Sequence, residues 1–138
     1  MRGLAFVLRA KIAITIVAWA FPLLLLPASV LVGLGFPLPT PEVFLRLLGM
    51  AYLALVLGYF LGLRQAQAGV YPASTVQVGI LSNGGACVVL LIYAALGAWA
   101  DWGPLAQLFM WGSLLSTGAI TAGLVAFGPL STRRRDVG

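Results

Sequence analysis

Four long apolar stretches, separated by short connectors rich in glycine, proline and polar residues, dominate the sequence. They cover residues 12–34, 42–63, 75–99 and 104–127. Each reaches the roughly 20 residues that a helix needs to cross the hydrocarbon core of a bilayer. Because backbone amides inside a bilayer must find partners within the chain, stretches of this length must be helical. The pattern therefore predicts four transmembrane helices.

The connectors predict how these helices are arranged. Residues 35–41 contain three prolines and cannot continue a helix, residues 64–74 form the longest polar connector, and residues 100–103 form a tight turn. Connectors this short make consecutive helices antiparallel neighbours. We therefore expect one all-α domain over residues 1–138, an antiparallel four-helix bundle.

The composition places this bundle in a membrane. Hydrophobic residues make up 62% of the chain and charged residues 8%, against roughly 45–50% and about 25% in soluble domains. A soluble domain of this size buries too small a fraction of its surface to hide so many apolar side chains. The first apolar stretch also exceeds the roughly 7–15 residues of a signal-peptide core, so we expect a retained span.

The basic residues predict the orientation of the bundle. Seven of the eight lie at the N-terminus, in the connector 64–74 or at the C-terminus: Arg2, Arg9, Lys11, Arg64, Arg133, Arg134 and Arg135. The positive-inside rule then places both termini in the cytoplasm. Basic residues that flank apolar helices also contact anionic lipids, so membrane lipids are expected partners and nucleic acid is not.

Arg46 is the one basic residue of the second stretch, and Glu42 lies four residues before it on the same helical face. One interpretation is an interfacial ion pair, or an arginine that extends to the outer headgroups. The other is a binding site for an anion or a lipid headgroup at the outer end of the bundle. The sequence leaves both open.

Pro22 and Pro27 interrupt the first stretch. Each removes a backbone hydrogen bond and bends a helix. A plain kink is one interpretation, and a break that lines a substrate site is the other.

The third stretch holds a polar cluster with Gln77 and Asn83 as candidate ligand contacts. An amide that faced lipid would leave several hydrogen-bonding groups without partners, so Asn83 should face another helix or a cavity. It either joins two helices, with Gly84 and Gly85 allowing their close approach, or contacts a ligand.

Small and hydroxyl residues line faces of the second and fourth helices. Ser113 and Thr117 share one face and are candidates to line a path, although such hydroxyls also bond to their own helix. Ala54, Gly58 and Gly62 recur every four residues and predict close helix packing, within the chain or with another subunit.

Several chemistries are excluded by the residue types. The chain has no histidine, one cysteine and three acids, Glu42, Asp101 and Asp136, which lie at or beyond the ends of the apolar stretches. These residues cannot assemble the usual metal or haem ligand sets or a catalytic triad. We therefore expect no metal, no cofactor and no enzymatic activity.

Residues 44–59, FLRLLGMAYLALVLGY, resemble the second span of small bacterial four-helix families of the DoxX-like kind. In these families an Arg-x-x-Gly motif, here Arg46 to Gly49, opens a glycine-rich helix after a proline-containing loop. The resemblance implies a bacterial cytoplasmic (inner) membrane. Because some relatives are membrane subunits of oxidoreductases, it also implies a quinone or a partner subunit. Arg46 is the only residue of this chain that the resemblance assigns to a motif position of these families.

These observations predict a non-enzymatic accessory subunit that binds lipid, quinone or a partner membrane protein, or associates with itself. One alternative is an oligomeric channel or facilitator lined by Asn83, Ser113 and Thr117. Another is a lipid-modifying enzyme that positions its substrate with Arg46 and Asn83.

Overall fold

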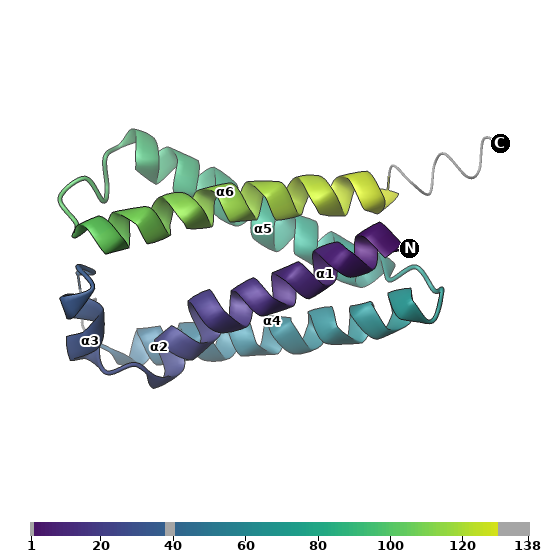
Figure 1. Cartoon of the computed structure of the whole chain (residues 1–138), viewed down its shortest axis with the longest axis horizontal. Coiled ribbons are helices and arrows are strands. Elements are labelled where there is room, and N and C mark those ends of the chain that lie inside the picture. The colour runs from purple at the N-terminus through teal and green to yellow at the C-terminus, as the bar shows by residue number, and fades with distance from the viewer. Residues whose placement is uncertain (1, 38–40, 130–138) are drawn as a thin grey trace.

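The computed structural model describes residues 2–37 and 41–129, and their regular structure is entirely helical, without a strand (Figure 1). Residues 133–136, which carry three of the basic residues and one acid, lie outside this part of the chain. The elements are α1 (Arg2–Ile14), the π-helix η1 (Thr15–Ala20), α2 (Phe21–Leu25), α3 (Ala28–Gly33), α4 (Val43–Gln67), α5 (Ala73–Ala95) and α6 (Pro104–Phe127).

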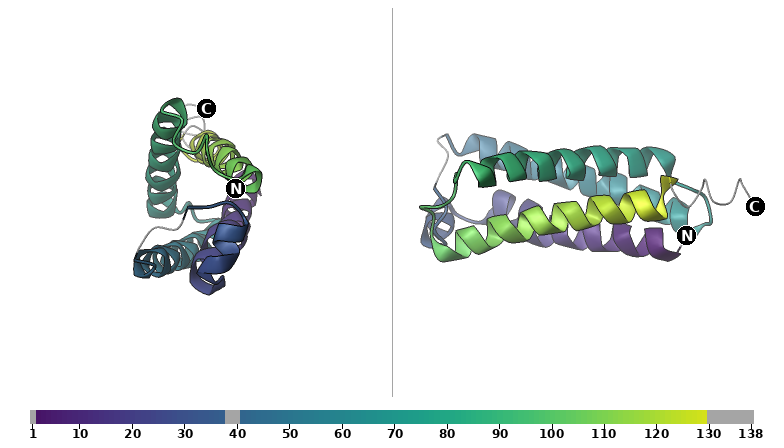
Figure 2. Two further views of the ribbon diagram at one scale, coloured as in Figure 1. Left: turned by 90° about the vertical axis from the view of Figure 1, so that its left-hand side faces the viewer. Right: turned by 90° about the horizontal axis from the view of Figure 1, so that it is seen from above.

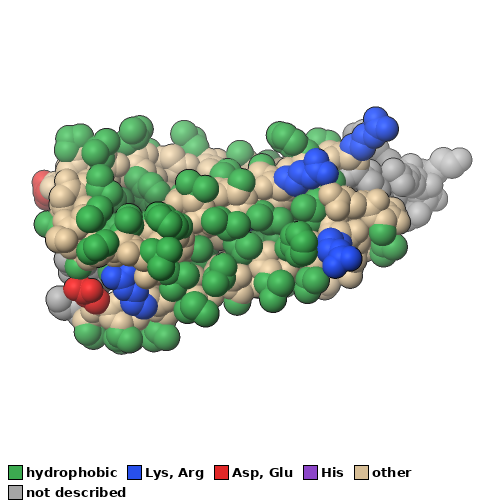
Figure 3. Space-filling view, turned by 60° about the horizontal axis from the view of Figure 1, so that its bottom comes forward, with side chains coloured by type: hydrophobic (Ala, Val, Ile, Leu, Met, Phe, Trp, Pro, Cys, Tyr) green, Lys and Arg blue, Asp and Glu red, His purple; other side chains and the backbone are tan. Residues whose placement is uncertain are grey.

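Within the described residues, four helices are long and apolar enough to cross a membrane. They are the continuous helix Arg2–Leu25, formed by α1, η1 and α2, and the helices α4, α5 and α6. Apolar side chains cover the surface, and basic side chains gather at the end that carries the N-terminus (Figure 3). The chain is a multi-pass membrane protein by these properties.

The first long helix differs from the predicted span 12–34, because it covers Arg2–Leu25. Proline has no N–H and pushes the preceding residue into extended conformations. Leu26, directly before Pro27, has φ −72° and ψ 133°, and the helix ends there. Residues 28–33 form the separate short helix α3, which lies across the end of the assembly (Figure 1). The helix therefore ends before the predicted end at residue 34, and it begins at Arg2, before the predicted start at residue 12.

The π-helix η1 ends at Ala20, two residues before Pro22. A proline ring clashes with the carbonyl four residues before it in a regular α-helix. Here the turn is wider, and the Phe21 N–H bonds to the carbonyl of Ile16, five residues earlier. The wide turn lets the helix continue through Pro22 as far as Leu25.

The other helices lie near their predicted positions. α4 extends to Gln67 instead of residue 63, and α6 covers the predicted residues 104–127. α5 ends at Ala95 instead of residue 99, because Gly97 turns the chain with φ +69°. Pro104 occupies the first turn of α6, where its missing N–H costs nothing.

The long helices pack unevenly around the core. α4 lies along the whole first helix, α6 lies along α5, and α1 joins the two pairs by contacting α6. α4 and α5 pack less closely, and the end-on view shows that their ribbons stand apart (Figure 2). The core that α1, α4, α5 and α6 build contains Leu4, Leu8, Tyr59, Val76 and Leu124, each at most 1% exposed.

At the end away from the N-terminus, two glycines bring the connectors together. The Gly103 N–H donates to the carbonyl of Gly35 over 3.1 Å. A Cβ on Gly35 would stand 2.5 Å from the Gly103 Cα, so this approach requires glycine. The contact joins the segment after α3 to the turn before α6.

Candidate functional site

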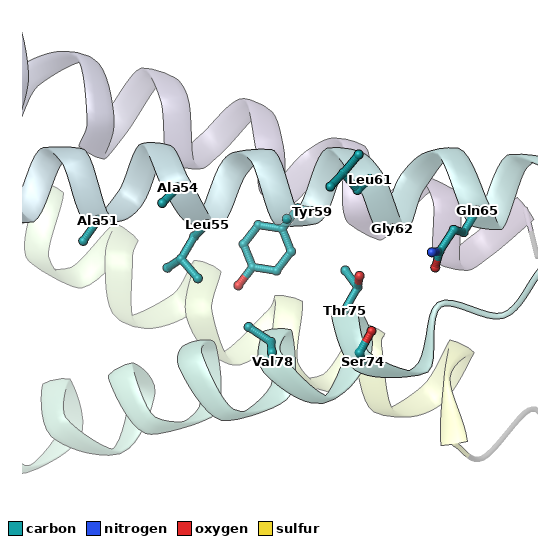
Figure 4. A pocket seen from close by; sticks show the side chains of 11 residues that line it. Ala51, Ala54, Leu55, Tyr59, Leu61, Gly62, Gln65, Ser74, Thr75 and Val78 are labelled. Carbon is teal, nitrogen blue, oxygen red and sulfur yellow. The ribbon is translucent and has the colours of Figure 1, made fainter.

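The opening between α4 and α5 forms a groove with a volume of about 760 Å³ (Figure 4). The two helices approach each other where Gly62 faces the Thr75 side chain, and they diverge from there. Three small side chains on successive turns of α4, Ala51, Ala54 and Gly58, line the wide part. The groove exists because these residues fill little of the space between the helices.

The opposite end of the groove is polar. Gln65 from α4 and Ser74 and Thr75 from α5 line it (Figure 4). Arg64 is exposed in the same helical turn as Gln65. In the adjoining connector, burial raises the pKa of the Tyr71 hydroxyl above its ordinary value. The groove thus runs from an apolar part to a polar end beside a cation.

Tyr59 separates these two parts and reaches across to α5. Its side chain lines the groove, and its hydroxyl lies 2.7 Å from the Ser82 Oγ. Ser82 also lies 3.4 Å from the Asn83 Nδ2, which donates to the Gly79 carbonyl over 2.7 Å. This hydrogen-bonded network connects α4 to α5 where the helices have begun to diverge.

Lys11 lies on the α1 side of Tyr59, with its Nζ 5.6 Å from the ring centroid. Its residue is only 8% exposed, so it belongs to the interior and does not flank the first span as the sequence suggested. Lys11 lies about 14 Å along the axis from Arg2, near the middle of the long helix Arg2–Leu25.

Arg46 forms a hydrogen bond with the backbone of the first helix close to its break. Its Nη1 donates to the carbonyl of Leu23 over 2.8 Å. In a regular helix this carbonyl would bond to the N–H of residue 27, which is a proline. Glu42 lies 3.9 Å from the other guanidinium nitrogen, at the weak limit for an ion pair. The partner of Arg46 is thus a backbone carbonyl of the first helix, which favours a structural role for this residue.

The remaining candidate ligand residues do not gather at one place. Gln77 is exposed on α5. Ser113 and Thr117 are buried, but each hydroxyl donates to a carbonyl of its own helix. Arg46 lies about 20 Å along α4 from the level of Tyr59 and Asn83. Arg46 and Asn83 therefore cannot contact the same small group.

The candidate packing glycines divide into two groups. Gly62 faces Thr75, and a Cβ on Gly84 would lie 3.4 Å from the Thr121 side chain, so both lie where helices meet. At Gly58 and Gly85, the described residues leave the space within 4 Å of a Cβ open. Ala54 and Gly58 therefore line the groove, and no helix of this chain packs on them.

A second cavity, of about 390 Å³, lies at the break of the first helix. Its walls are almost entirely apolar and include a row of four rings, each in contact with the next: Trp19, Phe109, Phe36 and Trp102. No charged side chain lines it. The cavity suits apolar groups and offers no partner for a charged ligand.

Sequence reasoning missed Lys11, Thr15 and Tyr59 as parts of the interior. Leu4, Leu8, Lys11 and Thr15 recur every three or four residues and so share one helical face. That spacing was the available signal, because a lysine in line with buried leucines faces the same way. The Tyr59 position had no comparable signal, since tyrosine is common at both interior and interfacial positions.

Comparison of the chain with protein-family models, with curated proteins and with solved structures gives no match. The resemblance of residues 44–59 to DoxX-like families stays a prediction, and the function is argued from the groove itself.

Proposed function

We propose that this protein is a non-enzymatic membrane subunit that binds an anionic membrane lipid in the groove between α4 and α5. The observation that carries the proposal is the two-part lining of the groove, with small apolar residues along its length and Gln65, Ser74 and Thr75 at one end. A lipid has the same division into an acyl chain and a polar headgroup.

The apolar part fits an acyl chain by its length and its depth. Ala51 and Gln65 lie about 21 Å apart along α4, whereas one leaflet contributes about 15 Å of hydrocarbon. Leu55, Leu61 and Val78 complete the apolar lining. The groove faces the bilayer, so an acyl chain enters it sideways without crossing a polar region.

The polar end fits an anionic headgroup. Its amide and hydroxyl groups donate hydrogen bonds, and Arg64 supplies a positive charge. The two acids of the described residues, Glu42 and Asp101, belong to the start of α4 and the turn before α6, at the far end of the assembly.

We also propose an antiparallel bundle with both termini in the cytoplasm of a bacterium. Arg2, Arg9 and Arg64 belong to the end that the positive-inside rule assigns to the cytoplasmic side of the inner membrane. That leaflet carries the negative surface potential, so the polar end of the groove would meet anionic lipids there.

Native mass spectrometry of the protein reconstituted with phosphatidylglycerol and phosphatidylethanolamine tests the proposal. We expect the wild type to retain phosphatidylglycerol and Gly58→Leu to lose most of it, because leucine fills the groove. Gly85→Leu is the matched control, since Gly85 is equally open but lies outside the groove. Arg64→Gln should keep a bound lipid but lose the preference for phosphatidylglycerol. Equal retention by all four proteins would remove the proposal.

The alternatives have less support in the geometry. A channel lined by Asn83, Ser113 and Thr117 would need free hydroxyls, whereas both hydroxyls bond to their own helix. Solute flux into liposomes above that of empty vesicles would nevertheless establish it. A quinone or a partner protein in place of the lipid would be identified by its mass in the same spectra.

A further inference from the structure

The interior of the helix assembly holds a lysine that forms no salt bridge within the described residues. Lys11 is 8% exposed, and its ammonium faces the Tyr59 ring. The two carboxylates of the described residues, on Glu42 and Asp101, form no salt bridge with it. A ring face attracts an ammonium, but it does not provide acceptors for three N–H groups. The N–H groups of Lys11 can therefore donate to an acceptor besides the Tyr59 ring.

Two further polar atoms of this interior lack partners. The Thr15 Oγ1 and the Asn83 Oδ1 are buried and make no hydrogen bond within the described part of the chain, and their residues are 0% and 1% exposed. The Asn83 Nδ2 donates to the Gly79 carbonyl, and this bond fixes the orientation of the amide. The Oδ1 is therefore an acceptor that needs a donor.

These groups are connected to one another through Tyr59. Thr15 follows Lys11 by one turn on the same face of the first helix. Lys11 faces Tyr59, whose hydroxyl lies 2.7 Å from Ser82, the neighbour of Asn83 in α5. The region thus joins a cation, a free hydroxyl and a free acceptor from separate helices.

We infer that ordered water is bound here, between Lys11, Thr15, Tyr59 and Asn83. The ligand must accept from an ammonium and also donate to an amide oxygen, and water does both, whereas lipid esters only accept. The site is separate from the groove and from the aromatic cavity, because neither is lined by Lys11, Thr15 or Asn83. Buried water typically makes about three hydrogen bonds to groups that would otherwise be unsatisfied.

This water site is distinct from the lipid groove and does not depend on it. Tyr59 stands between the two, with Lys11 against its ring and the groove along its side chain. The site keeps a hydrated cation inside the membrane next to the lipid-binding surface. The water bound at this site would exchange with other water molecules and would serve as a hydrogen-bonding partner for polar side chains inside the bundle.

Non-additivity between Thr15 and Asn83 tests the inference, because no hydrogen bond joins these residues directly. We compare Thr15→Val, Asn83→Leu and the double variant by thermal unfolding in one detergent. A shared water predicts that the double variant loses less than the sum of the single losses, by about 3 °C or more. Thr15→Val with Ser113→Ala is the matched pair, and it should be additive because Ser113 bonds only to its own helix.

Hydroxyl-radical labelling in lipid nanodiscs provides a readout on the wild type. Radicals formed from bound water modify the nearest reactive side chain, here Tyr59, although it is only 1% exposed. We expect Tyr59 to be labelled in the wild type and to lose most of the label in the double variant. Additive losses for Thr15 and Asn83, or an unlabelled wild-type Tyr59, would overturn the inference.

Discussion

Replacing Arg46 with methionine tests how the break in the first helix is held. The substitution keeps an extended apolar side chain but removes the 2.8 Å hydrogen bond to the Leu23 carbonyl, which Pro27 leaves without a helical partner. A hydrogen bond from a charged donor contributes about 1.5–3 kcal/mol. The Arg46 side chain is 34% exposed, so solvent screening places the loss at the lower end, about 1.5 kcal/mol.

For a chain of 138 residues this loss corresponds to a decrease in Tm of about 6 °C. Thermal unfolding in detergent, followed by circular dichroism, measures it. Glu42→Gln is the control, because it removes the 3.9 Å ion pair and keeps the bond to Leu23. An exposed pair of this kind contributes about 0–1 kcal/mol. If Glu42→Gln lowered the Tm as much as Arg46→Met, the ion pair rather than the carbonyl would be the important partner, and the reasoning would be refuted.

Two further substitutions probe the connectors and the interior. Gly35→Ala should lower the stability by about 2 kcal/mol or more, because Gly35 has φ +88° and its Cβ would stand against the Gly103 backbone; an unchanged Tm would contradict the close approach. Lys11→Glu should cost about 3–5 kcal/mol by burying an unpaired acid, and accumulation in membranes measures the effect. Arg9→Glu makes the same charge reversal on the exposed face of α1, so equal accumulation of the two variants would show that Lys11 is not buried.

The sequence predicted those parts of the fold that depend on local chemistry. Stretches of apolar residues identified four helices, and Pro104 marked the first turn of α6. The first helix was misplaced because Arg9 and Lys11 were both treated as flanking charges, although only Arg9 is exposed. The charge of a residue does not show whether its side chain is buried. The helical face that Lys11 shares with Leu8 does indicate that it is buried.

The candidate site depends on contacts that no single segment specifies. Asn83 is buried, as the cost of an amide in lipid predicted, and its Nδ2 donates to the Gly79 carbonyl of its own helix beside the Tyr59–Ser82 hydrogen bond that connects α4 to α5. The groove arises from the angle between α4 and α5, which is set where Gly62 meets Thr75. Residues 13 positions apart in the sequence fix this angle, and neither residue predicts it alone.

The wide turn of η1 determines the direction in which the residues of α2 point around the axis of the first helix. An α-helix advances by about 100° per residue, so one residue removed from Thr15–Ala20 would turn α2 by about that angle. The Leu23 carbonyl would then point away from Arg46, and Leu24 would leave Gly49. The wide turn therefore sets the rotation of α2 relative to α1. It lets α2 face Arg46 of α4 while Lys11 of α1 stays buried.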